Sequence, residues 1–197
     1  MGRASQASDA VFLNVPFDQG YESKFVALIA TVVAARLVPR CALELPERGE
    51  GQLGRIRKLL GDCALSIHDL SRPRRFNMPF ELGLAVALHE RADHEYILLA
   101  ASRAQFERAL SDLKNVAPLE HHHGARILIA RLADSLGAPK PERVEQVYQP
   151  LVRALPRLKR DYRVRTIFHK TIFNELKYGA LEEAKRLGLF SSTEGSV

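Results

Sequence analysis

The stretch that most constrains the fold covers residues 63–88, which read CALSIHDLSRPRRFNMPFELGLAVAL. It opens with a short apolar run that ends in the polar pair His68-Asp69, and residues 80–88 are apolar on every side of a helical wheel except at Glu81. This pattern predicts a buried strand, a loop and a buried helix. In an open α/β sheet, ligands bind beyond the carboxyl ends of the strands, so we expect Asp69 and Glu81 to face one cleft.

Strand-like and helix-like patterns alternate about five times before residue 137. Because parallel strands are joined by right-handed crossovers, this alternation predicts a flavodoxin-like α/β fold, in which a parallel sheet of about five strands carries helices on both faces. The predicted strands cover residues 10–15, 37–43, 63–67, 94–100 and, more weakly, 115–119. The predicted helices cover residues 22–36, 52–60, 80–88, 102–110 and 124–136.

After residue 137 the pattern is helical only, over residues 142–158 and 162–189, and we expect Pro150 and Pro156 to break the first of these segments. The sequence therefore predicts an α/β domain over residues 10–136 and a helical C-terminal extension over residues 137–190.

The extension is basic. Residues 138–197 contain 12 Lys and Arg against 7 Asp and Glu, so they carry +5 of the chain's net charge of +6. We expect this extension to pack on the domain, on a second copy of the chain or on a partner protein. Nucleic acid is a weaker alternative, because the aromatic residues of the extension fall at helical spacing, which suits packing better than base stacking.

The longest apolar run, residues 25–35, is too short to span a bilayer. Residues 1–9 are polar and lack the apolar core of a signal peptide. We therefore expect a cytoplasmic protein that does not enter the membrane. Cys41 and Cys63 fall inside predicted strands, so we expect them to be small core residues without a disulfide.

Glu81 is the strongest candidate for a functional side chain. If Asn77 is the N-cap of its helix, Glu81 lies one residue beyond the position of a capping-box glutamate. Its attraction to the helix N-terminus would contribute about 0.3–1 kcal/mol, which is small beside the several kcal/mol that burying a charge costs. The sequence therefore favours a functional role for Glu81.

Asp69 has two interpretations: a second carboxylate of the cleft, or a carboxylate that braces its own loop by pairing with Arg72, Arg74 or Arg75. Strand-end positions make Asn14, Phe17 and Glu44 further candidates for the walls of the cleft. Phe17 could stack on a ring, and Asn14 could donate a hydrogen bond to a ribose or a carbonyl. Each of the two also suits ordinary turn chemistry.

The sequence predicts neither a metal site nor a bound cofactor. His121, His122 and His123 are consecutive, so they do not share one face of a helix or strand, and no zinc motif accompanies them. We expect them to be solvated or to brace a loop. Residues 16–20 lack the glycine patterns of a dinucleotide-binding loop or a P-loop.

Four ordered blocks of the sequence resemble a bacterial group of TIR-like proteins related to nucleoside 2-deoxyribosyltransferases. The blocks are VFLNVPFD at residues 11–18, VPRCALE at 38–44, SIHDLSR at 66–72 and RFNMPFELGLA at 75–85. In the deoxyribosyltransferases, a motif of the type Phe-Glu-Leu-Gly-Tyr-Ala supplies a nucleophilic glutamate, and Glu81 matches it. An aspartate that closes the third strand assists there, and Asp69 matches that residue.

The resemblance implies cleavage of an N-glycosidic bond. TIR-domain NADases use a helix glutamate at the cleft to separate nicotinamide from ribose, often in anti-phage defence and often as assemblies. We therefore expect hydrolysis of NAD as a substrate, with Glu81 acting on the ribose, Asp69 and Asn77 holding its hydroxyls, Phe17 stacking on the ring, and Glu44, Asn14 and Arg72 as further contacts. The alternatives are a non-catalytic nucleotide-sensing or assembly module, and base transfer between deoxynucleosides.

Overall fold

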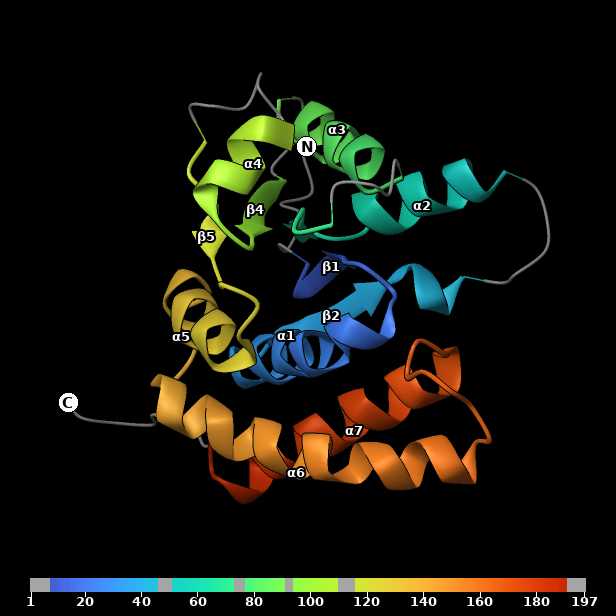
Figure 1. Cartoon of the computed structure of the whole chain (residues 1–197), viewed down its shortest axis with the longest axis vertical. Helices are drawn as coiled ribbons and strands as arrows, with labels where there is room; N and C mark the ends of the chain where they lie inside the picture. The colour runs from blue at the N-terminus through green and yellow to red at the C-terminus, as the bar shows by residue number, and fades with distance from the viewer. Residues whose placement is uncertain (1–7, 46–50, 73–76, 91–93, 110–115, 191–197) are drawn as a thin grey trace, which may run out of the picture. The chain divides into compact units, whose positions relative to one another are not determined.

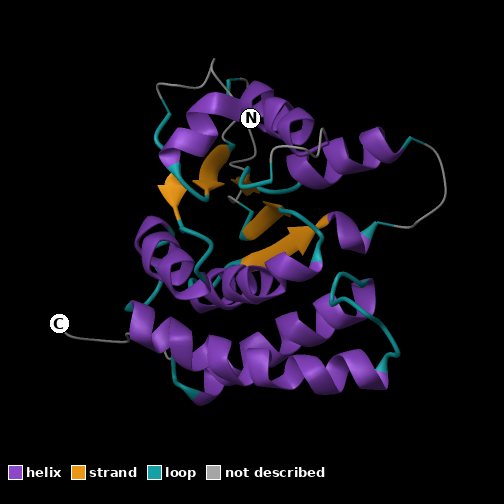
Figure 2. Cartoon of the chain, in the orientation of Figure 1, coloured by secondary structure: helices purple, strands orange, loops and turns teal. Residues whose placement is uncertain are grey.

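A parallel sheet of five strands is the central element of the computed structural model, which describes residues 8–45, 51–72, 77–90, 94–109 and 116–190. Its strands run in the order β2-β1-β3-β4-β5, which is the flavodoxin-like order. Figure 2 shows the strands in orange and the helices in purple. The predicted fold class, a parallel α/β sheet with surrounding helices and a helical C-terminal part, is confirmed. The strands are β1 (Ala10–Asn14), β2 (Val38–Cys41), β3 (Leu65–Asp69), β4 (Glu95–Ala100) and β5 (Leu119–Glu120).

The chain forms two compact units, each built from two stretches of sequence. The sheet unit, Met1–Phe17 with Leu37–His123, contains all five strands, the 3₁₀ helix η2 (Ala42–Glu44), α2 (Gln52–Gly61), α3 (Asn77–His89) and α4 (Arg103–Ala109). The helical unit, Asp18–Arg36 with Gly124–Val197, contains η1 (Gln19–Tyr21), α1 (Glu22–Ala34), α5 (Ala125–Ser135), α6 (Pro141–Asp161) and α7 (Lys170–Arg186). The predicted domains, residues 10–136 and 137–190, stay a prediction.

Within the sheet unit, α3 packs against β1, β3 and β4 and lies alongside α2 (Figure 1). The apolar side chains on this face form two clusters. One joins Phe12 of β1 to α2 and to Ala85 of α3, and the other joins Met78 and Leu82 of α3 to β4 and to Phe106 of α4. Because α3 contributes to both clusters, the packing holds its first turns over the carboxyl ends of β1 and β3.

Within the helical unit, α1 contacts α5, α6 and α7, and nearly all of its side chains are buried (Figure 1). An ion pair supports this packing: Lys159 Nζ of α6 lies 2.5 Å from Glu22 Oε2 of α1. The same carboxylate accepts a hydrogen bond from the backbone N–H of Ile167 at 3.2 Å. The basic C-terminal segment therefore packs on α1 through both apolar and charged contacts.

The expectation that Pro150 and Pro156 break a helix is wrong, because α6 runs without interruption from Pro141 to Asp161. A proline inside a helix removes a backbone hydrogen bond and costs about 3 kcal/mol. The buried face of α6 outweighs this cost, since packing of an amphipathic face supplies most of the stability of a helix in a protein. That face comprises Val144, Val147, Tyr148, Leu151, Leu155 and Leu158.

Two other predicted boundaries also need correction. The fifth strand covers Leu119–Glu120, and the described residues 116–118 of the predicted run are not part of it, because the pairing with β4 is made by Leu119 and Glu120. Residue 115 lies outside the described residues. The last helix, α7, begins at Lys170 and not at Tyr162, because residues 162–169 form a turn and loop that leads from α6 to α7.

Other local predictions are confirmed. Ser102 precedes α4 and accepts a hydrogen bond from the N–H of Gln105 at 3.3 Å, as an N-cap does. Gly137 follows α5 with a φ of 61°, a left-handed conformation that favours glycine at a helix C-terminus. Cys41 and Cys63 are buried free thiols.

Of the helices in the described part of the chain, none combines the length and apolar character needed to cross a membrane.

Candidate functional site

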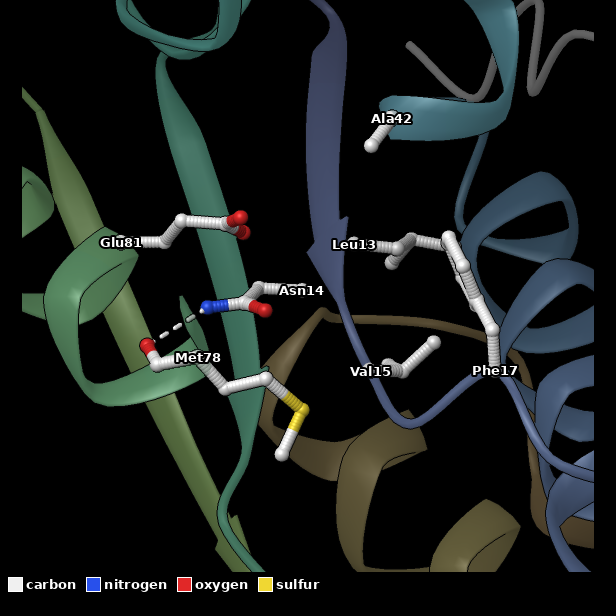
Figure 3. Close-up of a pocket in the computed structure, with 7 residues that line it drawn as sticks. All are labelled: Leu13, Asn14, Val15, Phe17, Ala42, Met78 and Glu81. Atoms are coloured by element: carbon white, nitrogen blue, oxygen red, sulfur yellow. Dashed lines mark hydrogen bonds between the residues drawn. The ribbon is translucent and has the colours of Figure 1, made fainter. Parts of the chain in front are cut away.

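A small pocket lies at the carboxyl ends of β1 and β2, beneath the first turns of α3 (Figure 3). In this strand order the chain switches direction across the sheet between β1 and β3, and ligands of flavodoxin-like proteins bind at that switch point. The pocket has a volume of about 40 Å³, enough for a few water molecules. It is lined by Leu13, Asn14 and Val15, by Phe17 after β1, by Ala42 after β2, and by Met78 and Glu81 of α3.

Glu81 is the one carboxylate among the described residues that line this pocket, and its carboxylate points between β1 and β3 (Figure 3). The side chain is only 6% exposed. Burial raises the pKa of Glu81 from 4.5 to about 7, because removing a carboxylate from water disfavours its charged form. A carboxyl that titrates near neutral pH can act either as a proton donor or as a base or nucleophile.

The Asn14 side chain lines the same pocket as Glu81 and is held by two hydrogen bonds. Its Nδ2 donates to the backbone carbonyl of Met78 at 3.0 Å and lies 2.9 Å from Nδ1 of His68. Both amide hydrogens are therefore used, so the expectation that Asn14 donates to a ligand is corrected. The remaining group, the amide oxygen, is an acceptor, and it lies on the side of the amide away from Met78 (Figure 3).

A row of polar side chains continues from Asn14 beneath α3. His68 is the neighbour of Asn14 in the register of β1 and β3, and its Nε2 lies 2.8 Å from Oγ of Ser66. Ser66 Oγ lies 2.9 Å from Nε2 of His94, and Nδ1 of His94 donates to the carbonyl of Cys63 at 2.8 Å. All of these polar side chains are buried, so a continuous set of hydrogen bonds leads away from the pocket.

Asp69 does not line the pocket. Its Oδ1 accepts a hydrogen bond from the backbone N–H of Ser71 at 2.8 Å, and its Oδ2 lies 3.0 Å from Nε2 of His121. Asp69 and His121 are both fully buried. These contacts fit the loop-bracing interpretation, with His121 as one partner; Arg74 and Arg75, two of the predicted partners, lie outside the described residues.

Glu44 also points elsewhere. Its Oε2 accepts a hydrogen bond from Nε of Arg40 at 2.6 Å and one from the backbone N–H of Cys41 at 3.4 Å. These contacts close the short helix η2 on itself, in the manner of a capping box. Ala42, on the same helix, faces the pocket where the sequence predicted Glu44.

The structure therefore brings together three of the predicted site residues: Asn14, Phe17 and Glu81. Asn77 is the first residue of α3, but its side chain lies outside the described residues. Arg72 follows β3 and is exposed. The roles that the sequence assigned to these residues stay predictions.

The histidine run follows β5, and its first residue contacts the turn that it belongs to. Nδ1 of His121 accepts a hydrogen bond from the backbone N–H of His123 at 3.0 Å, so His121 braces its own turn. Across the described ranges, no group of three or more His, Cys, Asp or Glu side chains is placed to hold a metal ion.

The hydrogen-bonded row of Ser66, His68 and His94 was not predicted from the sequence. A signal was present, because Ser66 and His68 are polar residues two apart in an otherwise buried strand and so share one face of the sheet. Buried polar side chains require hydrogen-bond partners, and this pair predicts a polar row beneath the following helix.

Comparisons of the chain with protein families, with curated proteins and with solved structures return no match.

Proposed function

We propose that this chain cleaves the N-glycosidic bond of a nucleotide, with NAD as the substrate and Glu81 as the catalytic residue. One observation carries the proposal: a buried carboxyl that titrates near pH 7 faces a cavity at the switch point of a parallel sheet. Among the described residues, Glu81 has no hydrogen-bond partner. Its carboxylate is thus available to a ligand, and burial strengthens any interaction that it makes with positive charge.

The reaction would proceed at C1′ of the nicotinamide ribose. The C1′–N bond breaks and its electron pair goes to the nicotinamide ring, which leaves as a neutral molecule because it is a cation in NAD. Positive charge grows on the ribose, and the Glu81 carboxylate either stabilises it or bonds to C1′ as an ester. Water then attacks C1′, giving ADP-ribose and one proton.

The single carboxylate favours NAD over neutral nucleosides. A neutral base leaves as an anion unless an acid protonates it, and that chemistry commonly uses a second carboxyl group. Asp69 is occupied with Ser71 and His121 and does not reach the pocket. Because nicotinamide needs no proton in order to leave, one carboxylate is sufficient. The positive ring would also lower the pKa of Glu81 and favour its ionised form.

The cavity limits which part of the substrate it can enclose. Its volume of about 40 Å³ is far below the roughly 300–1,000 Å³ of pockets that bury a whole ligand. The described walls would therefore hold only the groups around the scissile bond, and the rest of the nucleotide would lie outside this cavity.

A second candidate is a nucleotide-sensing module that binds at the same pocket without turnover. It is favoured by the same single carboxylate, since glycosidic hydrolysis usually employs a pair. Such a module gives saturable binding, and its bound nucleotide is recovered intact.

The experiment that separates these candidates uses the purified chain at several concentrations with NAD, and separately with a panel of deoxynucleosides and nucleotides. Products are resolved by liquid chromatography, and binding is measured by calorimetry. We expect NAD to be cleaved with release of nicotinamide, and the other compounds to stay intact. Glu81→Gln should lose this activity. Glu90→Gln should keep it, because Glu90 is an exposed residue just after α3. Binding of NAD without any product would support the sensing module, and free base from the deoxynucleosides would support base transfer.

A further inference from the structure

The polar row behind the pocket is bounded by a backbone carbonyl at each end. Asn14 donates to the carbonyl of Met78, and His94 donates to the carbonyl of Cys63. Carbonyl oxygens only accept hydrogen bonds, so the side chain next to each carbonyl must be the donor. Once the donor at each end is known, the positions of the hydrogens between the two ends follow.

Both imidazoles in the row are neutral at physiological pH. Burial, with a smaller contribution from the neighbouring His94, lowers the pKa of His68 to about 3. Burial also lowers the pKa of His94. A neutral imidazole has one N–H group and one acceptor nitrogen, so each ring can donate in only one direction along the row.

The two ends give the same order of donors. From the pocket side, Asn14 donates to Nδ1 of His68, so the hydrogen of His68 is on Nε2 and is donated to Ser66. The Ser66 hydroxyl then donates to Nε2 of His94, whose hydrogen is on Nδ1. From the far side, the Cys63 carbonyl requires that same hydrogen on Nδ1. Every hydrogen in the row is used once.

Rotation of the Asn14 amide by half a turn would break this arrangement. The amide oxygen would then face the carbonyl of Met78 and Nδ1 of His68, and both are acceptors in this row. Each buried group left without a donor costs about 1–3 kcal/mol. The row therefore holds the amide in one orientation.

We propose that His68 is a positioning residue of the pocket: supported by Ser66 and His94, it holds the Asn14 amide so that Asn14 presents only its oxygen to the bound nucleotide. This proposal rests on the proposed function, because it takes the pocket as the nucleotide site. The group that Asn14 recognises is then a hydrogen-bond donor, a hydroxyl or an amide N–H of the substrate. A group that can only accept is rejected at this position.

The first test needs no turnover and follows the Asn14 side-chain amide by ¹⁵N NMR, with its signals assigned by their loss in Asn14→Asp. In the wild-type chain we expect these hydrogens to exchange slowly with water. His68→Leu removes the acceptor and should accelerate exchange by about tenfold or more, the equivalent of one hydrogen bond. His68→Asn has the same shape as His68→Leu but keeps an acceptor, and should restore slow exchange. Unchanged exchange in folded His68→Leu would overturn the proposal.

If His68→Leu does not fold, Ser66→Ala takes its place. This smaller change removes the group that fixes the hydrogen of His68 on Nε2, so exchange at the Asn14 amide should accelerate by about threefold or more. Exchange equal to that of the wild-type chain would contradict the proposal in this form as well.

The second test uses turnover. His68→Leu should raise KM for NAD by about tenfold with kcat changed less than about threefold, and Asn14→Leu should do the same. Because His68 acts through Asn14, the double variant should be no worse than Asn14→Leu alone. Additive effects would overturn the proposal while leaving the role of Glu81 intact. Full cleavage by Glu81→Gln would instead reject the proposed function, and the NMR test would still decide the role of His68.

Discussion

Oδ2 of Asp69 lies 3.0 Å from Nε2 of His121, and both side chains are fully buried. The contact joins the last residue of β3 to the residue that follows β5, although β4 lies between these strands in the sheet. Nδ1 of His121 accepts a hydrogen bond from the backbone N–H of His123, so Nε2 is the ring nitrogen left for the contact with Asp69. The pair thus braces the carboxyl edge of the sheet.

Asp69→Asn should weaken the fold and leave substrate affinity nearly unchanged. The change leaves one acceptor oxygen for two contacts, those with Ser71 and His121. We expect the free energy of unfolding to fall by about 1–3 kcal/mol, measured by urea denaturation. KM for the substrate should stay within about twofold of wild type. Asp62→Asn, at an exposed position, is the control and should change neither quantity. A loss of activity of tenfold or more at unchanged stability would show that Asp69 takes part in the reaction.

The rate of cleavage should depend on pH through Glu81. In the proposed mechanism the carboxylate is the active form, and burial raises the pKa of Glu81 to about 7. We therefore expect kcat/KM to rise about tenfold per pH unit below that value and to level off above it. The kcat profile should be shifted to lower pH, because bound cationic substrate favours the carboxylate. A profile that is flat from about pH 5 to 8 would contradict a catalytic role for Glu81.

The same carboxyl should make the fold less stable at higher pH. Below pH 4.5 Glu81 is neutral in the folded and the unfolded chain, whereas above about pH 7 it is charged in both, and the folded state must bury the charge. Its contribution to stability is therefore present at low pH and is lost as pH rises through its folded pKa. Relative to wild type, Glu81→Gln should gain up to about 3 kcal/mol of unfolding free energy between these pH values.

The check is a series of urea denaturation curves from pH 5 to pH 8 for wild type, Glu81→Gln and the control Glu90→Gln. The difference between wild type and Glu81→Gln should grow with pH, and that between wild type and Glu90→Gln should stay constant. A constant difference for both variants would show that Glu81 is not buried in the folded chain.

Pro156 in α6 offers a test of the helical unit. It lies on the exposed side of a continuous helix, where it removes a backbone hydrogen bond. Pro156→Ala restores that bond, which stabilises the folded chain. The variant also gives the unfolded chain more conformational freedom, which offsets part of this gain. We expect a net increase of about 2 kcal/mol in the free energy of unfolding. The neighbouring exposed Arg157→Ala should change stability by less than about 0.5 kcal/mol. A loss of stability in Pro156→Ala would show that the proline adapts α6 to its neighbours.

Local patterns were sufficient to predict the sheet and most of its helices. Alternation of short apolar runs with amphipathic segments identifies parallel α/β architecture, because each segment buries one face. The predictions failed where tertiary packing outweighed local preference. Pro150 and Pro156 weaken α6 locally, yet the buried face of that helix keeps it continuous. The strand β5 depends on its pairing with β4, which no local pattern records.

The sequence predicted the place of a residue in the candidate site where the position of its backbone also determines which way its side chain points. Asn14 is the last residue of β1, and Phe17 follows that strand. Glu81 lies in the first turns of α3, so Asn14, Phe17 and Glu81 line one pocket at the switch point. Asp69 ends β3, and Glu44 ends the short helix η2 that follows β2. Their carboxylates contact nearby groups: Arg40 and the N–H of Cys41 for Glu44, Ser71 and His121 for Asp69. A carboxylate binds the nearest donors, and the sequence does not show which donors are near.

The most direct test of the proposed function is the initial rate of nicotinamide release from NAD, measured by chromatography over a range of protein concentrations. We predict release by the wild-type chain and by Glu90→Gln, and a loss of about a hundredfold or more in Glu81→Gln, because an amide neither bonds to C1′ nor balances its charge. Nicotinamide release by Glu81→Gln at the wild-type rate, with the variant folded, would contradict the assignment of Glu81.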